Sequence, residues 1–233
     1  MLSKKVLTMI LAAAIAVVAT ISIQASAQSA EGGRRGGEGA PSGAVPATQQ
    51  QPPIAIKIVK PGLYMVTGGG GNSTVRLTRQ GVILVDTKNL GDQFYSDLLA
   101  ETKTVTPEPV KYVFITHVHQ DHSGNTGKFV QAGAQVVAHE GLKKNLKTGG
   151  VDGKGYTSAA GKPAPPNITY AKNKKIKLGE GKAEAYHFGR AHTSGDTIVY
   201  FPDMKIVSLG DMFVAGTPNC NYPVGGSLME WAK

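Results

Sequence analysis

The sequence predicts an α/β fold in which helices cover packed sheets, and three observations point to it. Short apolar runs rich in β-branched residues recur between Gly, Pro and Asn turn signals from residue 54 onward. Between these runs, several longer segments have the apolar spacing of helices. Residues 53–233 have the length of one domain, and no repeat of regular period divides them. Strands and helices mixed in this order favour helices on the outside of sheets.

The first 27 residues, 1–27, have the features of a signal peptide. Lys4 and Lys5 precede an apolar run over residues 6–23, and Ala-Ser-Ala at 25–27 is a small-residue pattern that a signal peptidase accepts. Cleavage before Gln28 would give a secreted or periplasmic protein without stable membrane association. The alternative is an uncleaved anchor, because the run is nearly long enough to span a bilayer. Its many alanines and the cleavage pattern favour removal.

Residues 28–52 are predicted to be a disordered linker. They combine Gly-Gly pairs with Gln, Pro, Ala and Ser and show no apolar period, so they cannot bury enough surface to offset the entropy of ordering. The adjacent Arg34 and Arg35 raise the alternative of a nucleic-acid arm, but the interleaved glutamates argue against it. The folded domain is therefore expected over residues 53–233.

The first half of this domain is expected to mix strands and helices. Strands are predicted at 54–59, 63–67, 74–78 and 82–86, and the glycines at 68–71 form a hairpin tip between the second and the third. Residues 92–103 predict a helix with Phe94, Leu98 and Leu99 on one side. The remaining elements are a strand at 112–116, a helix at 126–132, a strand at 135–138 and a helix at 140–147.

The second half is expected to be mainly strands after a long loop. Residues 149–168 are rich in Gly and Pro, and loops of this length in compact domains are often functional. Strands are predicted at 174–178, 183–188, 197–201 and 205–209, and residues 225–233 have the pattern of a helix that begins.

Charge and cysteine content narrow the classes of function. The chain has 25 Lys and Arg against 16 Asp and Glu, a formal net charge of +9, but its lysines are scattered. They form a solvated face or attract an anionic substrate, and no aromatic residues interleave with them as a nucleic-acid platform requires. A small-molecule substrate is favoured, and no nucleic-acid partner is expected. The single Cys220 allows no internal disulfide, so stability must come from packing and bound metal.

One turn concentrates the candidate ligands. Residues 116–122 read Thr-His-Val-His-Gln-Asp-His, so His117, His119, Asp121 and His122 directly follow a strand. Imidazole nitrogens and carboxylate oxygens are ligands that borderline divalent metals such as zinc prefer. If the strand continues, His117 and His119 share one face, and the loop can then turn Asp121 and His122 toward a second metal. Such clusters seldom serve packing.

Two further candidates follow later strands. His192 lies in the turn at 189–196, where it is free to point outward as a ligand. Asp211 follows the strand predicted at 205–209, and a carboxylate at a strand end is well placed to bridge two cations. Taken alone each is weak evidence, because a lone histidine in a turn is more often solvated.

Together these motifs resemble those of the metallo-β-lactamase superfamily. The His-x-His-x-Asp-His run, His192-Thr-x-Gly-Asp and Leu209-Gly-Asp211 occur in the superfamily's order, and Asp86 matches its first motif, an aspartate that braces the ligand loop. The resemblance spans nearly the whole domain and implies an αββα sandwich with the site at one edge of two packed sheets. It implies a first metal on His117, His119 and His192, a second on Asp121 and His122, and Asp211 bridging both.

The sequence departs from the superfamily's pattern at its end. The superfamily has a final histidine near its C-terminus, on a Gly-His-Gly-like turn, and this sequence stops at Lys233. Leu228, Met229 and Trp231 begin an apolar face that nothing later completes. We therefore expect a fragment, in which the sandwich lacks its last elements and the second metal is short of a ligand.

The resemblance implies a hydrolase that uses zinc, as two ions, with iron or manganese as alternatives. A hydroxide held between the ions, its pKa lowered to about 7, would attack an ester, thioester, lactone or β-lactam. Asp121 would be the catalytic residue that orients it and passes a proton to the leaving group. One lactamase subclass has a zinc-binding cysteine where Asp211 stands and a substrate-binding lysine where Val214 stands, which favours the broader hydrolases.

Two functions from other classes stay open. The superfamily includes iron-dependent sulfur dioxygenases, and a missing last ligand would suit a non-catalytic binding module. Among the weaker candidates, His187 is expected to be structural within its strand or to support a metal ligand from behind, and Cys220 to be inert or a free thiol. The glycines at 68–71 are expected to be a flexible hairpin tip beside the pocket, because no Gly-Lys-Ser/Thr follows them as in a phosphate loop.

Overall fold

The computed structural model describes residues 52–148 and 164–233. The predicted signal peptide and nearly all of the predicted linker lie outside the described residues, as does most of the loop predicted at 149–168. Within the two described ranges no helix has both the length and the apolar character needed to cross a membrane.

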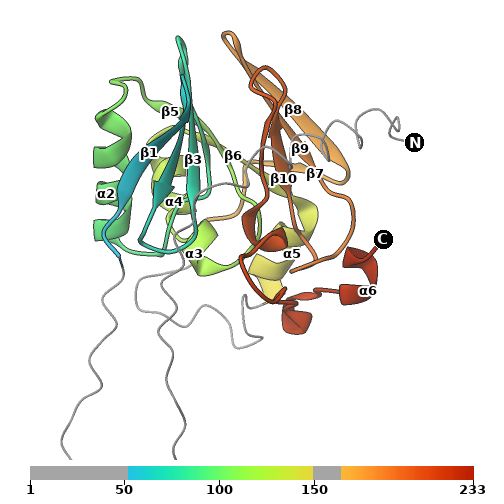
Figure 1. The fold of residues 1–233 in the computed structure, drawn as a ribbon. Helices are drawn as coiled ribbons and strands as arrows, with labels where there is room; N and C mark the ends of the chain where they lie inside the picture. Colours follow the sequence, from blue (N-terminus) through green and yellow to red (C-terminus); the bar gives the residue numbers. More distant parts are fainter. Residues whose placement is uncertain (1–51, 149–163) are drawn as a thin grey trace, which may run out of the picture.

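Two sheets pack against each other, and Figure 1 shows them side by side. The larger sheet has seven strands in chain order. Neighbouring strands are antiparallel from the first to the fourth and parallel from the fourth to the seventh. They are β1 (Ala55–Lys60), β2 (Leu63–Thr67), β3 (Ser73–Thr78), β4 (Gly81–Val85), β5 (Val110–Phe114), β6 (Gln135–His139) and β7 (Ile168–Tyr170). The smaller sheet is antiparallel, in the order β11-β10-β9-β8. Its strands are β8 (Asn173–Leu178), β9 (Gly181–Tyr186), β10 (Ile198–Phe201) and β11 (Ile206–Ser208).

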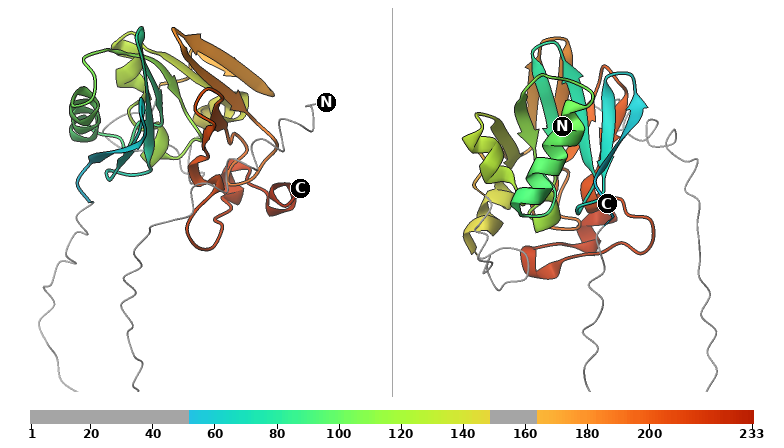
Figure 2. Two further views of the ribbon diagram at one scale, coloured as in Figure 1. Left: turned by 45° about the horizontal axis from the view of Figure 1, so that its top comes forward. Right: turned by 90° about the vertical axis from the view of Figure 1, so that its left-hand side faces the viewer.

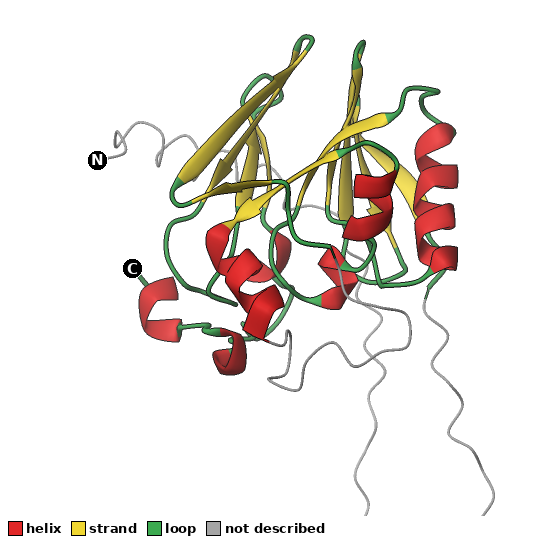
Figure 3. Ribbon diagram, turned by 180° about the vertical axis from the view of Figure 1, so that it is seen from behind, coloured by secondary structure: helices red, strands yellow, loops and turns green. Residues whose placement is uncertain are grey.

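Helices cover the larger sheet on the side away from the smaller one. The connections between its parallel strands carry α2 (Asp92–Lys103), α4 (Thr126–Gln131) and α5 (Glu140–Thr148), as crossovers between parallel strands require. Figure 2 (right) shows α2 lying in front of the strands. The single-turn helices α3 (Gln120–Ser123) and α6 (Leu228–Trp231) lie beyond one end of the strands, as Figure 3 shows from behind. Two short 3₁₀ helices, η2 (Gly210–Met212) and η3 (Tyr222–Val224), precede α6.

The strand β4 explains why the core strands are almost entirely apolar. All five of its residues are buried. Ile83 and Val85 belong to the apolar cluster between the two sheets, whereas Val82 and Leu84 belong to the cluster beneath the helices. Because successive side chains point to opposite faces of a sheet, this strand contributes to both cores. The predicted α/β class and packed-sheet architecture are therefore confirmed.

Several predicted boundaries were wrong where site geometry overrides the local pattern. The strand predicted at 82–86 ends at Val85, because Asp86 turns into the left-handed region with φ 62°. The strand predicted at 112–116 is β5, which begins and ends two residues earlier. The strand predicted at 183–188 ends at Tyr186, so His187 lies after the strand and not within it.

Three further differences concern short elements. The residues predicted as loop up to 168 end in the strand β7, which is only three residues long. The histidine turn contains the helical turn α3, which the sequence pattern did not indicate. The helix predicted at 225–233 begins at Leu228, because the Ser227 side chain accepts a hydrogen bond from the Glu230 amide and caps it.

Candidate metal centre

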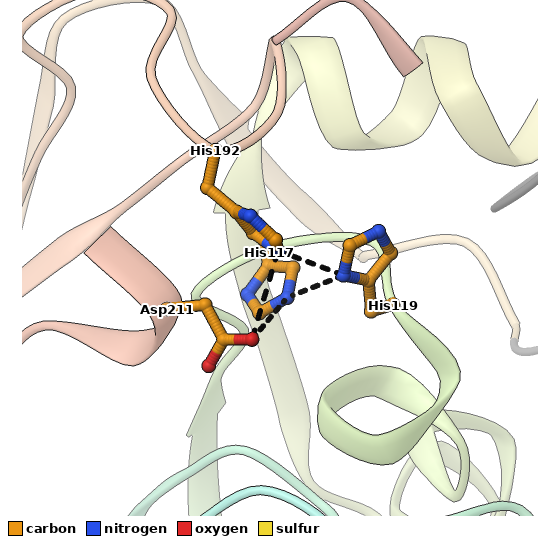
Figure 4. A group of neighbouring side chains, drawn as sticks. All are labelled: His117, His119, His192 and Asp211. Carbon is orange, nitrogen blue, oxygen red and sulfur yellow. Dashed lines mark hydrogen bonds and ion pairs between the residues drawn. The ribbon is translucent and has the colours of Figure 1, made fainter. Parts of the chain in front are cut away.

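The candidate ligands lie at strand ends of both sheets. The larger sheet supplies the turn after β5 and the helix α3, and the smaller sheet supplies the turn between β9 and β10 and the helix η2 after β11. Figure 4 shows the side chains of His117, His119, His192 and Asp211 pointing toward one another. The fold thus gathers residues that are up to 94 positions apart in the chain, from His117 to Asp211.

Asp86 fixes the start of the histidine turn. Its carboxylate accepts hydrogen bonds from the Thr116 amide at 2.8 Å and from the Thr116 hydroxyl at 2.7 Å. The Oδ2 atom also lies 2.7 Å from Nδ1 of His122. Asp86 is 1% exposed, so these contacts are made away from water. They are the contacts expected of the aspartate that braces the ligand loop.

Four atoms form the first group of the centre. They are Nε2 of His117, Nδ1 of His119, Nε2 of His192 and Oδ2 of Asp211, and the ligand atoms of these residues all lie within 4.8 Å of one another. Nδ1 of His119 is 3.1 Å from the His117 nitrogen and 2.8 Å from the His192 nitrogen. The Asp211 oxygen is 3.9 Å and 3.6 Å from the same two nitrogens. Two ligand atoms of one tetrahedral zinc lie roughly 3.4 Å apart, so this spacing suits a single small cation.

The outer nitrogen of each ring in this group has a partner of its own. Nδ1 of His117 lies 3.1 Å from the Thr116 hydroxyl, which donates its own hydrogen to Asp86 and therefore accepts from the ring. Nδ1 of His192 donates to the main-chain oxygen of Asn219. Such partners fix the tautomer of a ligating histidine and leave the lone pair of the inner nitrogen directed at the cluster.

Asn221 contacts the third ring. Its side-chain nitrogen Nδ2 lies 2.8 Å from Nε2 of His119. The oxygen and nitrogen of an amide are interchangeable in position and are assigned from the hydrogen-bond network. With the amide oxygen facing the ring, Nε2–H donates and the Nδ1 lone pair points into the cluster. A metal ligand at Nδ1 requires this arrangement.

Asp121 and His122 form the second group, on α3. Nε2 of His122 lies 3.2 Å from Oδ1 of Asp211 and 3.5 Å from Oδ2 of Asp121. This nitrogen is buried, and no group in the described part of the chain makes a well-aligned hydrogen bond to it, although the Asp211 carboxylate lies within ion-pair distance. A buried polar atom without a hydrogen bond calls for an explanation, and a metal ion supplies one. Asp211 presents one oxygen to each group, as a bridging carboxylate would.

The two groups differ in charge. Burial, together with the neighbouring histidines, holds the pKa of His117 well below its usual range, and burial and His192 lower the pKa of His119 to about 4. Burial acts in the same direction on His122, but Asp86 and Asp211 outweigh it and raise the pKa of His122 to about 10. Burial would raise the pKa of Asp211, but His122 reverses the shift and the pKa is lowered.

The turn that carries His192 is held by a second buried aspartate. The Asp196 carboxylate accepts from the Thr193 amide at 2.9 Å, from the Thr193 hydroxyl at 2.7 Å and from the Ala191 amide at 3.1 Å. The segment around η3 closes the turn, because the main-chain N–H of Asn221 donates to the main-chain oxygen of His192 at 2.8 Å. His192 is 1% exposed within this frame.

His187 is not part of the group, although it lies five residues before His192. Its Nδ1 donates to the main-chain oxygen of Asp196 at 2.7 Å, and its ring stacks on His139 with 3.7 Å between centroids. Cys220 is also outside it, with its thiol 3.4 Å from the main-chain oxygen of Ala191. Sequence reasoning missed Asn219, Asn221 and Lys88. No local pattern marks them, because their contacts lie far away in the chain.

Comparisons with known proteins point in one direction. Residues 66–229 match the family described as the metallo-beta-lactamase superfamily. The chain is 25% identical over 176 residues to a metallo-beta-lactamase type 2 from Elizabethkingia meningoseptica, covering 72% of this chain and 66% of that protein. It is 24% identical over 176 residues to the 2,4-dinitroanisole O-demethylase subunit alpha from Nocardioides sp., covering 75% of this chain and 51% of that protein.

A solved structure shows the same fold. The subclass B3 metallo-beta-lactamase BJP-1 of Bradyrhizobium japonicum superposes with a TM-score of 0.63 at 22% identity, over 81% of this chain and 74% of that one. The chain therefore spans about half to three quarters of the length of the proteins it resembles.

Proposed function

The chain belongs to the metallo-beta-lactamase superfamily, and we propose that it is a zinc-dependent hydrolase of small molecules. One observation carries the proposal. Three imidazole nitrogens and one carboxylate oxygen converge, and the other nitrogen of each ring has a partner. Nitrogen donors in this number with one carboxylate suit zinc, and also iron and manganese.

Each residue then has a proposed task. His117, His119 and His192 would hold a first ion, Asp121 and His122 would hold a second, and Asp211 has one carboxylate oxygen near each group. When bound, such ions polarise the scissile bond and lower the pKa of a water molecule to about 7. The Asp121 side chain is 40% exposed, more than that of Asp211, which is 32% exposed. Its carboxylate can therefore reach both solvent and a substrate, and we assign it the proton transfer to the leaving group.

We propose that the substrate is an ester, a thioester or a lactone, in preference to a β-lactam. Asp211 and Val214 stand where one lactamase subclass has a cysteine and a lysine, so the lysine's charge is absent at that position. The relatives named above include a β-lactamase and an O-demethylase that, by its name, acts on 2,4-dinitroanisole. Both a β-lactam and a nitroaryl methyl ether therefore belong in the substrate panel.

The test combines metal analysis with that panel. Full-length protein purified without added metal should contain zinc, and chelation should abolish hydrolysis of at least one ester, thioester or lactone, with zinc restoring it. A single iron per chain together with oxygen consumption on a persulfide would instead favour the sulfur dioxygenase. Metal-replete protein without hydrolysis of any panel member would contradict the proposal and favour a binding module.

We also propose that the mature protein is exported, on the basis of the apolar run and the Ala-Ser-Ala pattern at 25–27. N-terminal sequencing of the exported protein should give Gln28 as the first residue. A retained Met1 would count against it.

A further inference from the structure

Lys88 is a lysine in an unusual place. It has no solvent exposure and is among the largest fully buried side chains of the described residues. Its ammonium donates to the main-chain oxygens of Val66 at 2.6 Å and Gly71 at 2.8 Å. Burying an ammonium is costly unless its hydrogen bonds are made and opposite charge is near. The hydrogen bonds are made, but burial outweighs the favourable charges of Asp86 and Asp121 and lowers the pKa of Lys88 to about 8.

Of the two carbonyls that Lys88 binds, that of Gly71 belongs to the glycine hairpin, residues 68–71, which connects β2 to β3, and that of Val66 lies shortly before it. This hairpin lies directly on the second group of the metal centre. The Gly71 amide donates to the main-chain oxygen of Asp121 at 3.2 Å. A Cβ atom on Gly71 would lie 2.3 Å from the His122 ring, and one on Gly70 would lie 2.9 Å from Cβ of Asp121. Only glycine permits this approach, so the hairpin backbone forms a wall against both side chains.

The backbone around Lys88 supports a dedicated role. Asp86 and Lys88 both have left-handed conformations, with φ 62° and 66°, which residues other than glycine adopt rarely. Such conformations persist where the surrounding contacts determine them, and they cluster at functional sites. Here they aim Asp86 at Nδ1 of His122 and Lys88 at the hairpin that covers the same ring. The two side chains thus secure His122 from two sides.

We propose that Lys88 is a positioning residue, which holds the glycine hairpin against Asp121 and His122 and so fixes the second half of the metal centre. The assignment of a second ion to this half rests on the proposed function. The contact of Lys88 with the hairpin does not. A lysine that merely stabilised the core would loosen the whole sheet when removed, whereas a positioning lysine would loosen the hairpin and the second half alone.

Amide hydrogen exchange in metal-free, full-length protein tests the hairpin contact. In Lys88→Met, exchange of the Gly71 amide should rise about tenfold or more, while amides of β9 and β10 keep their protection. Lys60→Met is a matched control, because Lys60 also donates to a main-chain oxygen, that of Met204 at 3.1 Å, but at the surface. It should leave the hairpin unchanged. Unchanged Gly71 exchange in Lys88→Met, or a rise of equal size across both sheets, would overturn the proposal.

Metal titration tests the consequence for the site. Lys88→Met should weaken binding of the second zinc by roughly tenfold or more, as partners of ligating residues do, and leave the first unchanged. Gly71→Ala keeps Lys88 but displaces the His122 ring, so it should give the same selective loss even if Lys88→Met fails to fold. If Gly71→Ala binds each of the two ions with the same affinity as the wild type, the proposal is overturned. A wild-type protein that binds one zinc would refute the two-ion function, and the exchange experiment would still decide the role of Lys88.

Discussion

The two halves of the metal centre present their histidines in opposite electrical states. In the first half, burial keeps His117 and His119 neutral, and the outer nitrogens of the rings meet hydroxyl, amide and carbonyl groups without formal charge. In the second half, His122 lies between the carboxylates of Asp86 and Asp211. An imidazole must be neutral to bind a metal. His117 and His119 are therefore ready for an ion at neutral pH, whereas at His122 an ion must displace a proton.

The largest effect is expected from removing a ligand of the first half. His119→Ala should lose the first ion far more completely than the roughly 10–100-fold weakening typical of a lost outer partner. His187→Ala is the control, because His187 contacts the Asp196 main chain and not the cluster. Elemental analysis after dialysis measures both. Equal metal content in the two variants would contradict the assignment of His119.

Asp211 tests whether the halves share a ligand. Asp211→Ala should lose the second ion and most of the hydrolytic rate, while the first ion stays on three imidazoles, which suffice for a catalytic zinc. Asp211→Cys should be milder, because a thiolate still binds zinc but disfavours manganese. If Asp211 only stabilises its turn, both variants will melt at lower temperature with an unchanged metal-to-protein ratio.

Asn221 tests the tautomer of His119. With the amide oxygen facing the ring, Asn221→Ala removes the acceptor for Nε2–H, so affinity for the first ion should fall by roughly 10–100-fold. Asn219→Ala is a closely matched control two residues away, because His192 bonds to the main-chain oxygen of Asn219 and keeps that bond without the side chain. Competition with a zinc chelator ranks the two variants. Similar losses in both would show that the segment acts as a whole.

A pH titration should separate the halves without any substitution. The raised pKa of His122, about 10, means that a proton competes for its nitrogen throughout the neutral range, whereas the pKa of His119, about 4, leaves that ring free of a competing proton. As the pH falls from 8 to 6, the second ion should therefore dissociate before the first. Metal-to-protein ratios after equilibrium dialysis follow this order, and simultaneous release of both ions would refute it.

The smallest effect is expected in metal-free protein, whose free energy of unfolding should fall toward both acidic and alkaline pH. The lowered pKa of His119 contributes stability that is present above the unfolded value of 6.5 and is lost as the pH falls toward 4. The raised pKa of His122 contributes stability that is present below 6.5 and is lost as the pH rises toward 10. Urea unfolding at pH 5, 6.5 and 9 should show a maximum near 6.5. Asp86→Asn should flatten the alkaline side, and an unaltered alkaline slope would argue against the ion pair.

Most of the fold and the candidate ligands could be predicted from local patterns in the sequence. The helix α2 and the strand β2 lie where the apolar spacing predicts them, because burial of one face or both faces leaves a periodic record. The histidine turn is recognisable because its candidate ligands lie within six residues. Asn221 contacts a histidine 102 residues away and Lys88 a carbonyl 17 residues away. Neither residue differs locally from a surface residue, so only the folded structure identifies them.

The division of the candidate ligands between the sheets has a mechanical consequence. His117 and His119 follow a strand of the larger sheet, whereas His192 and Asp211 belong to segments flanking strands of the smaller one. An ion held by both sets would cross-link the two sheets, as a disulfide bond can in other proteins. Cys220 is a free cysteine and forms no such cross-link here. Metal-loaded protein should therefore resist pulling forces that shear one sheet across the other. Conversely, weaker packing between the two sheets should lower the affinity for the ion.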